Sequence, residues 1–228
     1  MTLRGFSSKK NNKSRNLRGH ALAEYKKTIK LNPMQKEVLV GTLLGDASIP
    51  LAKGKSKFHV KFEQNIARDA YIWHLYSIFK NFVGTPPQVR EIRGGGAQDR
   101  QSMWFRTYGH PEFQFYDSLF YPVHEHTGLR RKKRIPQNIG EFLTPRALAY
   151  WFMDDGTSYR RNYYLSTHSF PLEDQEILVQ AFIDNFSIPA KIYKDRSMYR
   201  MAIPSASSEK FVNLISPYIH PCFDYKIQ

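Results

Sequence analysis

Cysteine, acidic residues and long apolar stretches are all scarce in this sequence. Cys222 is the only cysteine among 228 residues, which excludes an internal disulfide and suits a reducing compartment. The longest clean apolar run covers residues 148–153, far short of the length that crosses a bilayer. Only 20 Asp and Glu residues stand against 34 Lys and Arg, a net charge of +14. That excess favours a polyanionic partner, and we expect nucleic acid and no membrane.

The basic residues are concentrated at the N-terminus. Residues 1–30 hold nine Lys and Arg but one acid, Glu24, and so supply +8 of the net charge. Because Ser, Asn and Gly separate them, we expect residues 1–32 to form a basic, partly disordered arm. The arm either adds non-specific affinity for phosphates or is a targeting segment, since transit peptides are also rich in Arg and Ser and poor in acids. The sequence leaves both open.

Two apolar runs organise the rest of the chain. They are residues 39–47 (LVGTLLGDA) and residues 148–156 (LAYWFMDDG), and each places an Asp, Asp46 or Asp155, before a small residue where the run ends. We expect both runs to be helices. A carboxylate at the negative C-terminal end of a helix is unfavourable by a few tenths to about 1 kcal/mol. A positive group should therefore lie beside each Asp, and a divalent cation is the natural candidate.

Two glycines of the first run predict that these helices touch. Gly41 and Gly45 lie four residues apart on one helix face, where glycine lowers helix propensity. They make sense if another backbone comes very close. The residues at the same positions of the second run are Tyr150 and Asp154, so we predict that small residues of one helix meet large ones of the other. A loosely specified core helix is the alternative.

Hydrophobic periodicity gives the same order of elements around both runs. The predicted fold class is α+β, with two pseudo-symmetric αββαββα half-domains, residues 33–120 and 145–228, joined by a basic connector, residues 121–144. The expected helices cover residues 33–46, 67–82, 110–120, 145–155, 172–186 and 205–219. The expected strands cover residues 57–64, 88–93, 100–108, 162–168, 190–194 and 198–203.

The paired runs resemble the motif of the LAGLIDADG homing endonucleases, in the single-chain form that carries it twice. The first run matches the consensus at Leu39, Gly41 and Asp46, and the second matches at its first two and last two positions. Similar flanking blocks occur at residues 135–136, 143–145, 166–170 and 225–226. The resemblance implies antiparallel sheets that form a DNA-binding saddle. It also implies a monomeric endonuclease without an obligatory protein partner, which cuts both strands of a long asymmetric site in intron homing in a chloroplast or mitochondrion.

The resemblance assigns roles to several residues. Asp46 and Asp155 would anchor Mg²⁺, for which Mn²⁺ can substitute, since Mg²⁺ needs only one or two carboxylates besides waters and substrate phosphates. Lys133 and Lys226 match the family's two active-site lysines. Further catalytic candidates end the strands that should pass the carboxylates: Glu63, Gln64, Thr167 and His168. A lone His is more often structural. Asp154, about 100° around the helix from Asp155, is expected either to pack or to support the residues that contact the metal.

Strand residues laid into the major groove of double-stranded DNA would read its sequence. The candidates are Lys53, Lys57, His59, Lys61, Gln88, Arg90, Arg93, Arg100, Arg106, Arg160, Arg161, Tyr163, Lys191, Tyr193, Lys194, Tyr199 and Arg200. Such polar strand faces, like the five-cation run of residues 130–134, can also be solvated surface or contact phosphate only.

Two other functions fit parts of the sequence. An RNA-binding, intron-splicing maturase of the same fold need not cut, but binding alone would not require both Asp and both Lys residues. An acid dyad like that of aspartic proteases fits poorly, because residues 155–157 (DGT) lack that family's Asp-Thr/Ser-Gly order, and the charge suits a polyanion better than a peptide.

Overall fold

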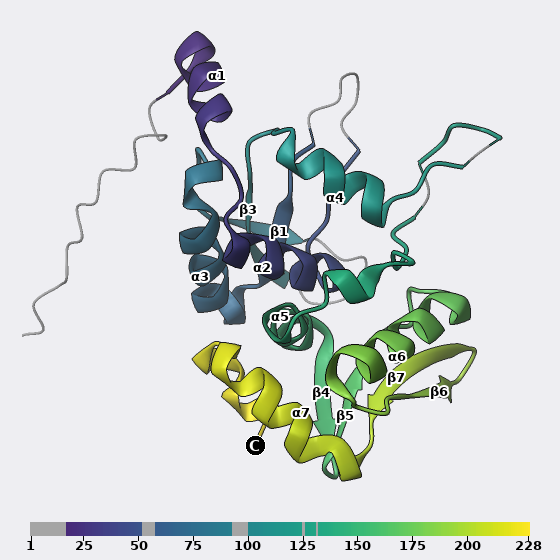
Figure 1. The fold of residues 1–228 in the computed structure, drawn as a ribbon. Helices are drawn as coiled ribbons and strands as arrows, with labels where there is room; N and C mark the ends of the chain where they lie inside the picture. The colour runs from purple at the N-terminus through teal and green to yellow at the C-terminus, as the bar shows by residue number, and fades with distance from the viewer. Residues whose placement is uncertain (1–16, 52–57, 93–99, 125, 131) are drawn as a thin grey trace, which may run out of the picture.

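Two half-domains pack against each other through a central pair of helices in the computed structural model (Figure 1). The structure describes residues 17–51, 58–92, 100–124, 126–130 and 132–228. The central helices are α2 (Pro33–Leu44) and α5 (Pro145–Asp155), and one antiparallel sheet lies on each side of them. This is the predicted α+β class with two antiparallel sheets. Among the described residues, no helix has both the length and the apolar character needed to span a membrane.

The first half-domain contains fewer regular strands than the repeat pattern predicts. Its elements are β1 (Lys61–Asn65), α3 (Asp69–Phe79), β2 (Gln88–Ile92), β3 (Arg100–Arg106) and α4 (Glu112–Phe120), and the sheet order is β1-β3-β2. Between α2 and β1, pairing is confined to one bridge, Ser48 to Lys61, in the part that the structure describes. The predicted helix over residues 67–82 is α3, flanked by single 3-10 turns. Alternation in β1 is as expected, with Val60 and Phe62 buried.

The second half-domain shows the complete αββαββα order. After α5 come β4 (Gly156–Tyr159), β5 (Asn162–Leu165), α6 (Leu172–Phe186), β6 (Lys191–Asp195), β7 (Met198–Ile203) and α7 (Ser208–Ile215), with sheet order β4-β5-β7-β6. Strand β4 was not among the predicted strands. Its hairpin turns at Arg160 and Arg161, whose φ angles are 47° and 63°. Such turns usually carry Asn or Gly, so the sequence lacked the expected turn signal.

Part of the N-terminal arm is a helix that the sequence analysis did not predict. Helix α1 (Gly19–Thr28) buries no residue, so hydrophobic patterning could not reveal it. It is held by tertiary hydrogen bonds instead: the Tyr25 hydroxyl donates to the Asn81 carbonyl at 3.0 Å, and the His110 ring lies 2.7 Å from the Lys26 carbonyl. Residues 1–16, the rest of the arm, lie outside the described residues.

Both central helices begin where the sequence predicts. Asn32 and Gln35 form a reciprocal capping box, in which each side chain accepts a hydrogen bond from the other residue's backbone N–H. In the second half the Thr144 hydroxyl accepts from the backbone N–H of Ala147 at 3.2 Å. A proline at the first helical position follows each cap.

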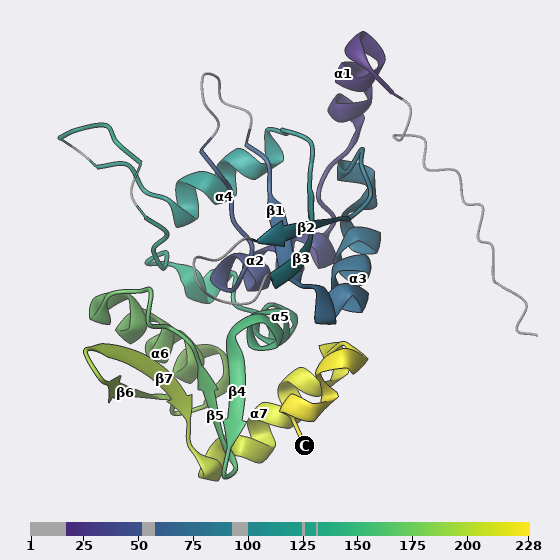
Figure 2. The same cartoon turned by 180° about the vertical axis from the view of Figure 1, so that it is seen from behind.

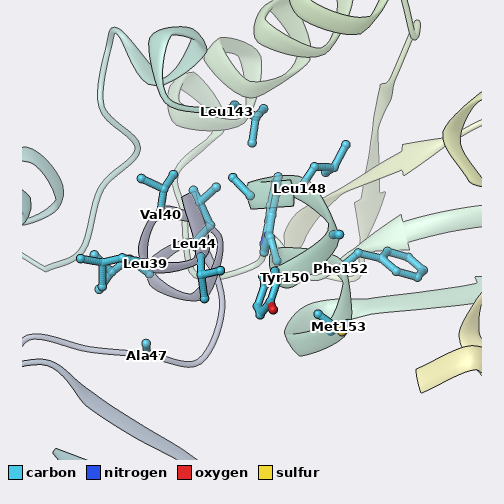
Figure 3. Close-up of a cluster of buried hydrophobic side chains, with 14 of the residues drawn as sticks. Leu39, Val40, Leu44, Ala47, Leu143, Leu148, Tyr150, Phe152 and Met153 are labelled. Atoms are coloured by element: carbon cyan, nitrogen blue, oxygen red, sulfur yellow. The ribbon is translucent and has the colours of Figure 1, made fainter. Parts of the chain in front are cut away.

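The two central helices approach closely enough to exclude a methyl group at Gly41. A Cβ atom placed there would lie 2.2 Å from the Ala147 carbonyl oxygen and 2.9 Å from the Tyr150 Cβ. At Gly45 it would lie 2.5 Å from the Asp154 Cβ. The small residues of α2 therefore face large residues of α5, as the motif positions led us to expect. Figure 3 shows buried side chains around this crossing, of which Leu39 and Phe152 point away from the facing helix into their own half-domains.

We predict that Gly41→Ala destabilises the fold by about 3 kcal/mol or more, the upper end of overpacking penalties, because the obstacle is backbone. The gain of about 1 kcal/mol in helix propensity offsets only part of this. Urea denaturation measures the change in the free energy of unfolding.

Gly140→Ala is the matched control, since a Cβ there meets nothing closer than 3.7 Å. It should change the free energy of unfolding by no more than about 0.5 kcal/mol. An unchanged or higher stability of the Gly41→Ala variant would show that the helices tolerate a wider spacing than the structure indicates.

Candidate active site

Two carboxylates lie where α2 and α5 end. Asp46 follows α2 after a single turn and is exposed, whereas Asp155 is the last residue of α5 and is partly buried. Burial, reinforced by the charge of Asp46, raises the pKa of Asp155 to about 7 against the opposite effect of Lys133 and Lys226. The two helix ends therefore bring one carboxylate from each half into a shared electrostatic environment.

Asp154 holds Asp46 in position. Its Oδ2 accepts a hydrogen bond from the Asp46 backbone N–H at 3.2 Å. The Gln64 side-chain amide donates to Asp154 Oδ1 at 3.1 Å and to Asp46 Oδ2 at 2.6 Å. Burial raises the pKa of Asp154 well above its usual range, and the charges of Asp46 and Asp155 add to the effect. Asp154 is thus more than a packing residue, because it connects the two motif ends.

Two lysines, the partly buried Lys133 and the buried Lys226, supply the positive charge that the helix ends require. Lys133 Nζ donates to the carbonyls of Gly45 at 3.0 Å and Ala47 at 2.8 Å, on either side of Asp46. Lys226 Nζ donates to the Met153 carbonyl at 2.7 Å. Burial lowers the pKa of each lysine to about 8, although the aspartate charges act in the opposite direction. We expected a metal to neutralise the helix ends, but lysine ammonium groups contact their last carbonyls directly.

The connector and the C-terminus hold these lysines in place. Next to Lys133, the Arg134 guanidinium donates to both carboxylate oxygens of Asp174 at 2.8 and 2.7 Å, which ties the connector to the first turn of α6. Lys226 ends a 3-10 helix, Pro221–Lys226, that is anchored by the buried Phe223.

Three members of the five-cation run are partly buried and have partners within the protein. Besides Lys133 and Arg134, Arg130 pairs with Asp117 and lies 3.6 Å from the centre of the Tyr121 ring. Lys132 is exposed, and residue 131 lies outside the described residues.

A pocket of about 390 Å³ opens beside Asp155. Hydroxyl groups and two cations surround the carboxylates in it; the lining residues are Arg68, Asp154, Asp155, Gly156, Thr157, Ser158, Ser166, Tyr225 and Lys226. Arg68 and Ser166 were not among the sequence candidates. The Ser166 backbone N–H donates to the Asp155 carbonyl at 3.1 Å. This register is set by the β4–β5 hairpin, which the sequence analysis did not predict. Arg68 comes from the other half-domain, so no local pattern indicates it.

Three candidates for orienting water have other partners. Glu63 lies on the sheet with Lys61, Arg90 and Ser102 at 2.5 to 2.6 Å. Burial alone would raise its pKa, but these hydrogen bonds and charges lower it. His168 Nε2 lies 3.2 Å from Asp195 Oδ2, and buried Thr167 donates to Gln175 at 2.7 Å. Of the strand-end candidates, Gln64 is the one for which the structure shows hydrogen bonds to the motif carboxylates.

The proposed base-reading residues differ in their exposure. Strands β2 and β3 expose Gln88, Arg90, Arg100 and Arg106, and the second sheet exposes Arg160, Arg161, Lys191, Tyr193 and Lys194, while Lys61, His59, Tyr199 and Arg200 are partly buried. Figure 2 shows these two sheets on opposite sides of α5. Tyr163 is 6% exposed and packs on Phe152 and Phe211, so it is a core residue. Lys53, Lys57 and Arg93 lie outside the described residues.

The donor set suits a hard divalent cation held jointly with a substrate. In the described part of the chain, no three His, Cys, Asp or Glu side chains converge to hold a metal alone. Asp46 and Asp155 offer the one or two carboxylates that Mg²⁺ typically takes, with phosphate and water completing its octahedron. Because burial and then the charge of Asp46 raise the pKa of Asp155, a cation bound beside it would favour its charged form.

We predict that Asp155→Asn stabilises the protein in a chelating buffer at pH 7.5. A carboxyl whose folded-state pKa is raised to about 7 contributes stability that is present below its unfolded pKa of 3.8 and is lost as the pH rises through 7. The gain is on the order of 3 kcal/mol, which for a chain of this size raises Tm by roughly 2–4 °C per kcal/mol.

Thermal unfolding of the wild type and the variant at pH 5 and pH 7.5 measures this difference, which should shrink at the lower pH. A variant less stable than the wild type at pH 7.5 would mean that the Asp155 carboxylate is a net stabilising group even without metal.

Comparisons with known proteins identify the family of this chain. Residues 36–211 match the model of the LAGLIDADG DNA endonuclease family. The chain is 32% identical over 215 residues to the probable intron-encoded endonuclease 1 of Wickerhamomyces canadensis, covering 90% of this chain and 89% of that protein. It is 30% identical over 203 residues to the cytochrome b mRNA maturase bI2 of Debaryomyces hansenii, with 86% and 75% covered.

Among solved structures, the homing endonuclease I-WcaI bound to its DNA recognition sequence is similar over nearly its whole length. The TM-score is 0.84 at 29% sequence identity, covering 95% of this chain and 97% of that one. The match to the family model and the similarity of fold lead to one conclusion: this chain is a member of the LAGLIDADG DNA endonuclease family.

Proposed function

We propose that this protein makes a double-strand break at a specific DNA site by metal-dependent phosphodiester hydrolysis. The observation that carries the proposal is the paired site: two carboxylates at adjoining helix ends, with a partly or fully buried lysine bound to the carbonyls of each helix end. Binding alone would not require such a costly group of buried charges. Because one chain contributes both carboxylates, the proposed active form is a monomer.

Each part of the site has a distinct role in this proposal. Asp46 and Asp155 would hold Mg²⁺ or Mn²⁺, which when bound supplies Lewis-acid charge and lowers the pKa of an attacking water. Lys133 and Lys226 place fixed positive charge where the phosphate becomes more negative in the transition state. Gln64 and Asp154 keep the Asp46 carboxylate and backbone in position through the hydrogen bonds described above.

The two sheets would hold the DNA. Their exposed cations, such as Arg90 on β2 and Lys191 on β6, belong to strands on opposite sides of the central helices (Figure 2). Major-groove readout requires such donors at strand faces, while the remaining cations would contact phosphates. The relatives named as intron-encoded support a role in intron homing, and an organelle remains the proposed location.

A splicing maturase is the second candidate function, favoured by the similarity to the maturase bI2. The two functions can coexist on one fold, and cleavage separates them. Incubation with Mg²⁺ and a plasmid that carries the intronless junction of the gene enclosing this reading frame tests the endonuclease directly. Tight binding of the intron RNA without any DNA cleavage would favour the maturase.

We predict that Asp46→Asn and Asp155→Asn each abolish double-strand cleavage. DNA affinity should stay within about tenfold, because phosphate contacts dominate it. Agarose gels resolve intact, nicked and linear plasmid, and filter binding measures affinity. One variant can retain nicking of a single strand, since the halves differ in sequence. Full cleavage of both strands by either variant would rule out a two-site mechanism.

We predict that deletion of residues 1–16 weakens binding to all DNA sequences alike. Five cations are lost, and each phosphate contact contributes about 0.9 to the slope of log K against log salt concentration. Affinity titrations at several salt concentrations should show a shallower slope, while helix α1 and the cleavage position are retained. A changed sequence preference would show that this segment reads bases.

A further inference from the structure

The internal repeat defines which residues of the two halves are equivalent. Two residues after Asp46, Ser48 pairs with Lys61, and two residues after Asp155, Thr157 pairs with Tyr164. The same register matches Gln64 to Thr167. It also matches the residues directly before α3 and α6, which are Arg68 and Pro171. The starts of these helices thus agree with the strand pairing, so the correspondence does not depend on one element.

Arg68 reaches from the first half into the pocket of the second. It lines the pocket beside Asp155 together with Lys226. Its charge is, after burial, a cause of the lowered pKa of Lys226, so both cations face the same space. Its guanidinium contacts the Gln64 side-chain oxygen at 3.4 Å and the Phe223 ring at 5.2 Å from the ring centre. No carboxylate of the described residues forms an ion pair with it, which leaves the guanidinium available to an anion.

The second half offers no equivalent cation. Pro171 carries no charge, and the residues that follow it, Glu173 and Asp174, are acidic. The nearby Arg134 is already paired with both of these acids. Thr167, the counterpart of Gln64, is fully buried and hydrogen-bonded to Gln175 and to the Met201 backbone N–H. The start of α6 therefore supplies no cation to the Asp46 side of the site, whereas Arg68, directly before α3, supplies one to the Asp155 side.

We propose that the two DNA strands are cut at unequal rates, and that Arg68 makes the strand held beside Asp155 the first to be cut. The inference rests on the proposed endonuclease function. In the transition state, negative charge grows on the phosphate, and a preorganised guanidinium stabilises it more than a neutral side chain does. A phosphate beside Asp155 would meet Lys226 and Arg68. Beside Asp46, Lys133 would act without a second cation, because the residue equivalent to Arg68 is the uncharged Pro171.

Single-turnover cleavage of a duplex with a different label on each strand tests this proposal. The duplex carries the intronless junction described above. Lys226→Met and Lys133→Met assign each labelled strand to one side of the site. Arg68→Ala should slow the strand that Lys226→Met slows by about 100-fold, the loss typical of one stabilising donor, with little effect on the other strand. Arg68→Lys should restore part of the rate, and binding in a chelating buffer should change little.

Two further variants separate this role from a structural one. Lys80→Ala removes an exposed cation just beyond the other end of α3 and should change neither rate. Pro171→Arg places a guanidinium at the equivalent position of the second half and should speed the slower strand, which reduces the nicked intermediate. This gain cannot come from misfolding.

The outcomes distinguish the inference from the function on which it rests. Equal strand rates in the wild type, an equal loss on both strands in Arg68→Ala, or a loss on the strand assigned to Lys133 would each overturn the role of Arg68 while leaving the endonuclease intact. Absence of cleavage of either strand would refute the proposed function itself, and the inference with it.

Discussion

The close crossing of α2 and α5 is the constraint on which the rest of this structure depends. At Gly41 the helices are separated by less than a methyl group would require, and this spacing sets how near the two helix ends can come. The motif carboxylates lie at those ends. Packing at the crossing therefore controls the geometry of the site, and neither half-domain could form that site alone.

The site gathers charges that would repel one another if left uncompensated. Three aspartates meet where two helices present their negative ends, and burial of Asp154 and Asp155 adds a desolvation cost. Lys133 and Lys226 offset part of it, since each binds carbonyl oxygens at one helix end. Their lowered pKa values show that they too are kept charged at a cost. The buried charges therefore lower the stability of the fold and create a strong electric field at the site.

Pseudo-symmetry brings the two halves together without making them identical. Both contribute a carboxylate and a lysine at matching positions, but the surroundings differ at Gly45 against Asp154, Gln64 against Thr167, and Arg68 against Pro171. A protein assembled from two copies of one chain would present the same groups to both strands. A single chain is free of that restriction, which suits an asymmetric target.

The sequence by itself determined the elements whose signals are local. Caps and prolines fixed the starts of α2 and α5, periodicity located α6 and β7, and the paired motifs identified Asp46, Asp155 and the glycines at the helix crossing. Residues 1–16 and the segments around Lys53, Lys57 and Arg93 remain predictions only.

Tertiary structure alone decided the contacts between distant residues. Helix α1 buries no residue and is held by hydrogen bonds to residues more than 50 positions away, so no hydrophobic pattern in the sequence predicts it. The face of a strand that turns toward the helix ends decides which of its residues contacts the carboxylates. This selects Gln64 rather than Glu63 in the first half and excludes His168 in the second. Arg68 enters the site from the opposite half. A side chain's charge can be read from the sequence, but its partner is set by packing across the chain.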